Sequence, residues 1–111
     1  MLSRKVAAQL REIETPFYLY DINLLRQTLE SVMYESNKYN YKVHYAIKAN
    51  FNPVILKAIS AMGLGADCVS GGEVKAAFDN GFPADKIVYA GVGKSDEEIR
   101  YALSIDIARF N

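Results

Sequence analysis

Hydrophobic and polar residues switch repeatedly between the period of a strand and the period of a helix along this chain. Alternating or β-branched and aromatic positions indicate strands, and turn residues bound each of them. The predicted strands cover residues 15–21, 42–49, 64–70, 86–90 and 107–111. The first of them would enter the fold directly after Pro16.

Helical spacing of apolar residues follows each of the first four predicted strands. A stripe from Ile22 to Met33 follows Asp21, a typical helix cap, and predicts a helix to about residue 36. The other helix boundaries are marked by capping and stop residues. They are Asn52 with Pro53 and a stop at Gly63, Ser70 with Glu73 and a stop at Asn80 and Gly81, and Ser95 with Glu98.

Strands that alternate with helices through short links predict parallel βα units, and therefore an α/β fold. Four strands are half of a (β/α)8 TIM-type barrel, whose usual size is about 250 residues, so these units amount to about half of one. The chain of 111 residues ends on a predicted strand at Asn111. We therefore expect a truncated barrel, one domain over residues 1–111 that a longer protein would complete.

Composition narrows the classes of function. The chain has 13 Lys and Arg against 13 Asp and Glu, so a nucleic-acid partner is not expected. No stretch approaches the roughly 20 apolar residues of a membrane span, and the first residues lack the apolar centre of a signal peptide. The expected location is the cytoplasm. The single cysteine and single histidine argue against a metal cluster or an internal disulfide.

Candidate chemistry lies where parallel strands end, because the working groups of βα barrels gather at the carboxyl edge. Lys48 ends the strand predicted over 42–49, on the face shared by His44 and Ala46, and Asp67 takes the matching place on the next strand. A partly desolvated lysine there suits a Schiff base. A surface lysine and a surface ion pair are the alternatives from position alone.

Three further residues carry weaker signals. His44 is expected either to relay a proton or, more simply, to fill the barrel floor through hydrogen bonds. Cys68 should point to the other strand face and pack against a helix. The GVGKS run at 91–95 lacks the first glycine of a phosphate loop, so helix capping explains Ser95 better. The sequence does not show whether Arg109 points into the barrel or out of it.

Three linked motifs resemble a known enzyme family. They are YAIKAN around Lys48, GLGADCVSGGE at 63–73 and GFPADKIVYAGVGKSDEE at 81–98. In this order and spacing they resemble the N-terminal part of the fold-type III pyridoxal-phosphate decarboxylases, which have an alanine racemase-like barrel. Within that superfamily the diaminopimelate decarboxylases are the most similar branch.

The resemblance implies a cofactor, a reaction and site residues. Lys48 matches the lysine that forms the Schiff base with pyridoxal 5'-phosphate, Ala46 and Asp67 match positions close to the cofactor, and Glu73 matches a more distant one. The implied reaction is decarboxylation of meso-2,6-diaminopimelate to L-lysine, in lysine biosynthesis, by a homodimer. In the family the phosphate site, the acid at the pyridine nitrogen and a C-terminal β-domain lie beyond residue 111, so these residues alone should be inactive.

Other functions remain open at this stage. Related decarboxylases of the same superfamily act on ornithine, arginine or a carboxylated polyamine such as carboxynorspermidine. A barrel protein that binds pyridoxal phosphate without catalysis is an alternative from another class. A structural fragment that binds nothing is the third.

Overall fold

The computed structural model describes residues 3–111 and contains one parallel four-stranded sheet in the order β1-β2-β3-β4. The helices are α1 (Arg4–Leu10), α2 (Ile22–Lys38), α3 (Pro53–Ala61), α4 (Gly71–Asp79) and α5 (Asp96–Ser104). The strands are β1 (His44–Ala46), β2 (Gly65–Cys68), β3 (Ile87–Tyr89) and β4 (Arg109–Phe110), and 3-10 turns cover η1 (Ile47–Ala49) and η2 (Ala84–Lys86). The predicted parallel α/β architecture is confirmed.

The two faces of this sheet have different surroundings. On one face Ala66, Cys68, Ile87 and Tyr89 are fully buried and share a core with residues of α3, α4 and α5. This core is continuous along the helix side of the sheet, and it includes Phe82, which follows α4. Each βα unit therefore packs its helix on the same side, as right-handed crossovers require.

Side-chain caps explain where the helices begin. Asp21 accepts hydrogen bonds from the backbone N–H groups of Asn23 and Leu24, each at 3.0 Å. Asn52 accepts one from Val54 at 3.0 Å, and Ser95 and Glu98 form a reciprocal capping box at α5. Each cap contributes about 1 kcal/mol. The predicted starts of these helices are confirmed.

The strand predicted over residues 15–21 is wrong. These residues form an irregular extended segment that contains a cis peptide bond between Thr15 and Pro16. Tyr18 is 89% exposed, and no described strand lies beside the segment to pair with it. A strand needs a neighbour to satisfy its backbone groups, so an alternating pattern alone does not produce one.

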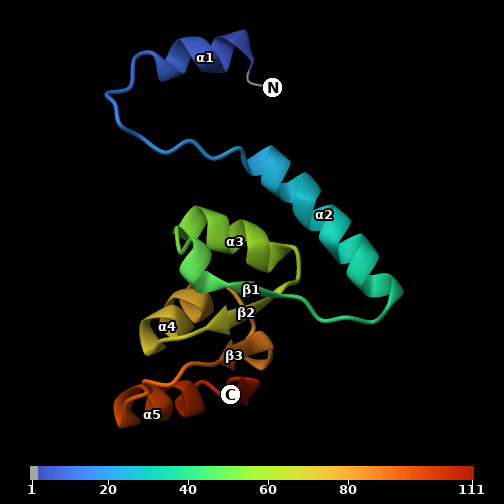
Figure 1. The fold of residues 1–111 in the computed structure, drawn as a ribbon, viewed down its shortest axis with the longest axis vertical. Helices are drawn as coiled ribbons and strands as arrows, with labels where there is room; N and C mark the ends of the chain where they lie inside the picture. The colour runs from blue at the N-terminus through green and yellow to red at the C-terminus, as the bar shows by residue number, and fades with distance from the viewer. Residues whose placement is uncertain (1–2) are drawn as a thin grey trace.

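Helix α1 was not predicted. It has apolar residues at helical spacing, Val6 and Leu10, but none of its residues is buried. Figure 1 shows α1 at the top of the view, separated from the sheet by the extended segment and α2. The radius of gyration of 16.6 Å reflects this projection, since a compact chain of this length has about 13 Å.

The strand predicted over 42–49 is shorter than expected. Only His44–Ala46 pairs with β2, and the chain then turns into the 3-10 helix Ile47–Ala49. The buried Ile47 side chain, which is 0% exposed, fixes this turn in the core. Lys48 therefore lies in a turn at the carboxyl edge, not on a face of the strand with His44.

Candidate functional site

One row of residues crosses the inner face of the sheet, opposite the helices. The register pairs Ala46 with Asp67, Asp67 with Val88, and Val88 with Arg109. Residues paired in this way project from the same face, and neighbouring strands lie about 4.8 Å apart. Ala46 and Asp67 are thus direct neighbours, and Lys48 follows two residues later. The register also answers the open question about Arg109, which belongs to this inner face.

Lys48 borders an open hollow of about 670 Å³ at the carboxyl edge. The side chain is exposed, and three aromatic residues share the hollow with it. The lining residues are Tyr18, Tyr20, Lys48, Ala49, Asn50, Phe51, Asn52 and Pro53. Lys48 therefore shares this hollow with aromatic residues. Sequence reasoning missed Tyr18 and Tyr20, because no local pattern links Lys48 to residues 30 and 28 positions before it.

Tyr45 stabilises the turn that contains Lys48. Its hydroxyl donates a hydrogen bond to the carbonyl oxygen of Asn50 at 3.1 Å, and burial raises the pKa of Tyr45. The Asn50 side chain in turn accepts a bond from the N–H of Asn52 at 2.9 Å. Within the YAIKAN segment, Tyr45 and Asn50 therefore stabilise the turn that contains Lys48 through these hydrogen bonds.

Glu73 has a local contact that its predicted role did not include. Its carboxylate accepts a hydrogen bond from the backbone N–H of Val69 at 2.8 Å, while Ser70 accepts one from the N–H of Glu73 at 3.2 Å. Glu73 thus fastens the loop that directly follows Asp67 and Cys68. Its observed contact is with this loop backbone.

His44 lies at the other end of β1 from Lys48. A Cβ atom at Gly65 would collide with the imidazole ring and with the backbone carbonyl of Lys86, so the ring packs directly against this glycine of the neighbouring strand. The proton-relay and floor roles of His44 stay predictions.

Cys68 is a core residue. It is 0% exposed on the helix side of β2, and burial, followed by the charges of Glu73 and Asp67, raises the pKa of its thiol to about 12. The predicted packing role is confirmed. A thiol in this state is a poor nucleophile at neutral pH.

We expect Cys68 to resist Ellman's reagent in the folded protein. At pH 8 the reaction should be about 10²-fold slower than in guanidinium chloride, because the buried thiol forms almost no thiolate. The measurement is the release of thionitrobenzoate with time. Equal rates in the folded and unfolded protein would contradict the assignment.

The GVGKS segment does not form a phosphate loop. The Lys94 amine donates hydrogen bonds to the carbonyl oxygens of Gly91 and of Asn111, the latter at 2.8 Å. It also lies 5.2 Å from the centre of the Tyr89 ring. The amine is thus already engaged by protein atoms, and Ser95 serves as the cap that the sequence predicted.

The carboxylate of Glu98 accepts several hydrogen bonds at the carboxyl edge of the sheet. It accepts hydrogen bonds from the backbone N–H groups of Ser95 at 2.9 Å and of Gly71 at 2.8 Å. These bonds and the Ser95 hydroxyl lower the pKa of Glu98. Its charged form therefore stabilises the folded state.

Acid should remove the stabilisation that Glu98 provides. Because the native pKa lies below the ordinary value of 4.5, the contribution is complete above that pH and is lost as the pH falls through the native pKa. We expect Glu98→Gln to lower the melting temperature at pH 7 and to have a smaller effect at pH 3.5. A difference that grows in acid would contradict this sign, and Glu97→Gln is the control.

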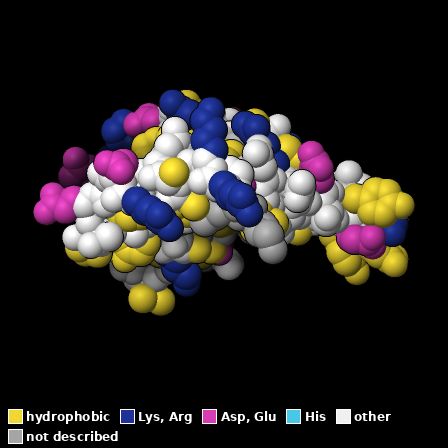
Figure 2. Space-filling model, turned by 90° about the horizontal axis from the view of Figure 1, so that it is seen from above, with side chains coloured by type: hydrophobic (Ala, Val, Ile, Leu, Met, Phe, Trp, Pro, Cys, Tyr) yellow, Lys and Arg dark blue, Asp and Glu magenta, His cyan; other side chains and the backbone are white. Residues whose placement is uncertain are grey.

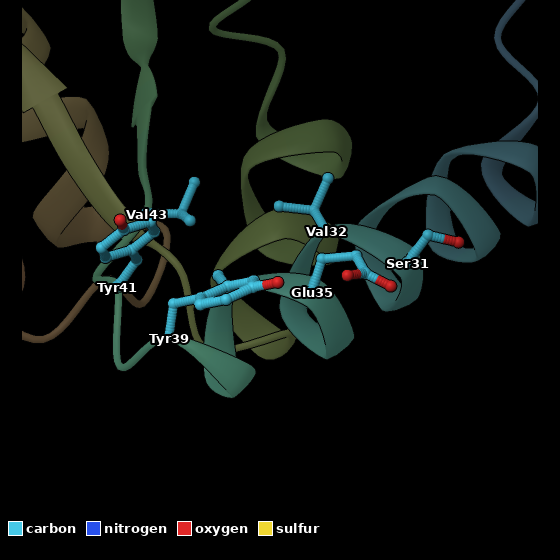
Figure 3. A pocket seen from close by; sticks show the side chains of 7 residues that line it. Ser31, Val32, Glu35, Tyr39, Tyr41 and Val43 are labelled. Atoms are coloured by element: carbon cyan, nitrogen blue, oxygen red, sulfur yellow. The ribbon is translucent and has the colours of Figure 1, made fainter.

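A second hollow lies away from these residues. It has about 560 Å³ and is lined by Ser31, Val32, Glu35, Ser36, Tyr39, Tyr41 and Val43. Figure 3 shows the Tyr39 ring extending toward Glu35 of α2, with Tyr41 beside Val43. The Tyr41 side chain that borders this hollow is 69% exposed.

The comparison with protein families decides the identity of this fold. A family model described as the pyridoxal-binding domain of pyridoxal-dependent decarboxylases matches residues 23–111. The chain belongs to the pyridoxal-dependent decarboxylases. The resemblance inferred from the three motifs is confirmed, and so is the cofactor class, because pyridoxal is what this domain of the family binds. The matched range begins inside α2 and leaves out α1 and the extended segment.

Individual decarboxylases agree with this assignment. The diaminopimelate decarboxylase of Bacteroides thetaiotaomicron is 56% identical over 102 residues, which are 91% of this chain and 26% of that protein. The crystal structure of diaminopimelate decarboxylase (I148L mutant) from Helicobacter pylori with L-lysine superposes with a TM-score of 0.85 at 37% identity, over 96% of this chain and 27% of that one.

A decarboxylase with another substrate has the same fold. The lysine/ornithine decarboxylase of Vibrio vulnificus, solved with cadaverine, reaches a TM-score of 0.82 at 28% identity, over 99% of this chain and 31% of that one. The chain spans about a quarter of the length of the curated relatives it matches.

The residues at this edge fit the aldehyde end of the cofactor. A pyridoxal aldehyde needs a primary amine, and Lys48 offers one in a hollow with aromatic walls. The carboxylate of Asp67 projects from the neighbouring strand. The fit therefore concerns the aldehyde end, which the Lys48 amine suits.

Proposed function

We propose that the complete protein decarboxylates meso-2,6-diaminopimelate to L-lysine. The observation that supports it best is the 56% identity with a diaminopimelate decarboxylase across 91% of the chain. This span includes both the Lys48 turn and the loop that follows Asp67. The proposed domain is residues 1–111 as the N-terminal part of a pyridoxal-phosphate-binding barrel.

Lys48, Ala46 and Asp67 are the proposed site residues. Lys48 would hold the cofactor through its amine and, once exchanged for the substrate, would be free to move a proton at the reacting carbon. Asp67 would orient that amine from the neighbouring strand, and Ala46 would leave room above the sheet. The cofactor supplies an electron sink for the bond that loses carbon dioxide.

The proposal extends to a cytoplasmic homodimer that acts in lysine biosynthesis. Within residues 3–111 the helices are all too short or too polar to cross a bilayer. The exposed rings of Tyr34, Tyr39 and Tyr41 provide contact area for a second copy. Figure 2 shows positive and negative side chains interspersed over the face that it presents.

An ornithine or lysine decarboxylase is the second candidate, favoured by the structural similarity to the Vibrio vulnificus enzyme. The test is carbon dioxide release by the complete protein, with pyridoxal phosphate, from meso-diaminopimelate, ornithine, arginine, lysine and carboxynorspermidine. We expect kcat/KM to be highest for diaminopimelate by about 10²-fold or more. A preference for ornithine or lysine would support the second candidate, and binding of the cofactor without turnover would support a carrier.

A further inference from the structure

The segment Gly91 to Glu98 contacts the loops on both sides of it. We call these eight residues the rim segment. In one direction Glu98 reaches the start of α4, 27 positions earlier, through the N–H of Gly71 at 2.8 Å. In the other direction Lys94 reaches the carbonyl of Asn111, directly after β4, at 2.8 Å. One short segment therefore ties together the loops that follow three consecutive strands.

The approach of Glu98 to α4 requires a glycine. A Cβ atom at Gly71 would lie 2.5 Å from the Glu98 Cγ, so the Glu98 side chain would have to move away from α4. The loop at Gly91 also approaches the preceding loop, because a Cβ at Gly91 would lie 3.1 Å from the carbonyl oxygen of Val69. Gly91 also has a φ of 96°, which favours glycine. The two loops are in direct backbone contact.

A buried tyrosine lies beneath this junction. Tyr89 is 0% exposed, and its hydroxyl has no hydrogen-bond partner among the residues that the structure describes. Burial raises the pKa of Tyr89, and the nearby charge of Glu98 raises it further, so the hydroxyl keeps its proton. A protonated hydroxyl is compatible with a neighbouring carboxylate, whereas a second anion would not be.

The loop that Glu98 holds is the one that carries Asp67 to α4. Only Val69 and Ser70 separate the end of β2 from the first residue of α4. The N–H of Val69 is fixed by Glu73 at 2.8 Å and the N–H of Gly71 by Glu98. With both anchors in place, the strand end that bears Asp67 has little freedom to move relative to Lys48.

We propose that Glu98 is a positioning residue for the cofactor-facing edge, which acts by fixing the loop between β2 and α4. This inference rests on the proposed function only in assuming that the edge binds pyridoxal phosphate. The Glu98 carboxylate has two oxygens. One accepts from the N–H of Gly71 at the start of α4, and the other accepts from the N–H of Ser95 at the start of α5. A glutamine has a single acceptor oxygen, and its amino group would face a backbone N–H.

The test compares Glu98→Gln with Glu97→Gln in the complete protein. Glu97 lies in the same first turn of α5, is exposed, and loses the same charge on substitution. A third variant, Ile59→Val, weakens the core at a residue that is 1% exposed and leaves the edge intact. This variant shows how a general loss of stability affects the same measurements.

Two readouts separate positioning from stability. Hydrogen exchange of a peptide covering residues 69–78 should become about fivefold faster in Glu98→Gln, since a hydrogen bond to a charged group is lost. The Kd for pyridoxal phosphate, from an absorbance titration, should rise about threefold or more for the same reason. Glu97→Gln and Ile59→Val should leave the affinity unchanged.

Unchanged exchange in Glu98→Gln would overturn the inference, and so would an equal loss of affinity in Ile59→Val. Both readouts are independent of turnover. If the complete protein binds the cofactor but does not decarboxylate diaminopimelate, the proposed function fails while the role of Glu98 is still supported by the two measurements.

Discussion

Substitution of Lys48 by alanine is expected to abolish both covalent attachment of pyridoxal phosphate and decarboxylation by the complete protein. The lysine is the only amine that lines the hollow at the carboxyl edge within residues 3–111. Activity should fall by about 10³-fold or more, because the group that holds the cofactor and moves the proton is removed. Borohydride reduction followed by peptide mass mapping identifies the lysine that carries the pyridoxyl group.

The matched control is Lys57→Ala. Lys57 is an exposed lysine of α3 and lines none of the hollows described above. We expect this variant to keep the label on Lys48 and to retain activity. A label that spreads over several lysines in the unsubstituted protein, or activity that survives in Lys48→Ala, would show that Lys48 is not the attachment site.

Substitution of Phe82 by alanine should cause the largest loss of stability among the changes considered. Phe82 is 1% exposed and follows α4, where its N–H donates to the carbonyl of Ala77 at 3.1 Å. Removing a buried ring leaves a cavity and should lower the free energy of unfolding by about 3–5 kcal/mol. Urea unfolding, monitored by circular dichroism, measures the change.

Phe78, which lies on α4 itself, provides the comparison. Its side chain is 42% exposed, so Phe78→Ala should cost about 1 kcal/mol or less. Similar losses for the two variants would contradict the placement of Phe82 in the core. The pair compares the same chemical change at a buried and an exposed position.

Much of the fold is local and was therefore predictable. Asp21, Asn52 and Ser95 cap the helices that they were expected to cap, because a cap uses side-chain and backbone groups within three residues of each other. Cys68 was placed on the helix face by strand alternation alone. These features depend on chain neighbours, which the sequence displays directly.

The candidate site was predicted in part. Asp67 was expected in the place that matches Lys48, whereas the register pairs it with Ala46, two residues earlier. Lys48 was expected on the strand but lies in a 3-10 turn, because Ile47 enters the core and ends the pairing. The assignment of the three residues to cofactor binding remains a prediction, for which the Lys48 and Glu98 experiments are the tests.

By itself, the sequence determined the alternation of strands and helices, their caps and the family motifs, all of which are encoded in short runs of residues. Tertiary structure decided what depends on distant partners. The alternating residues 15–21 form no strand because no strand among residues 3–111 pairs with them, and the face of Arg109 follows from pairing with β3. The bond between Glu98 and Gly71 joins residues 27 positions apart. Contacts between such distant residues form only when the sheet brings the loops together, so no local sequence pattern predicts them.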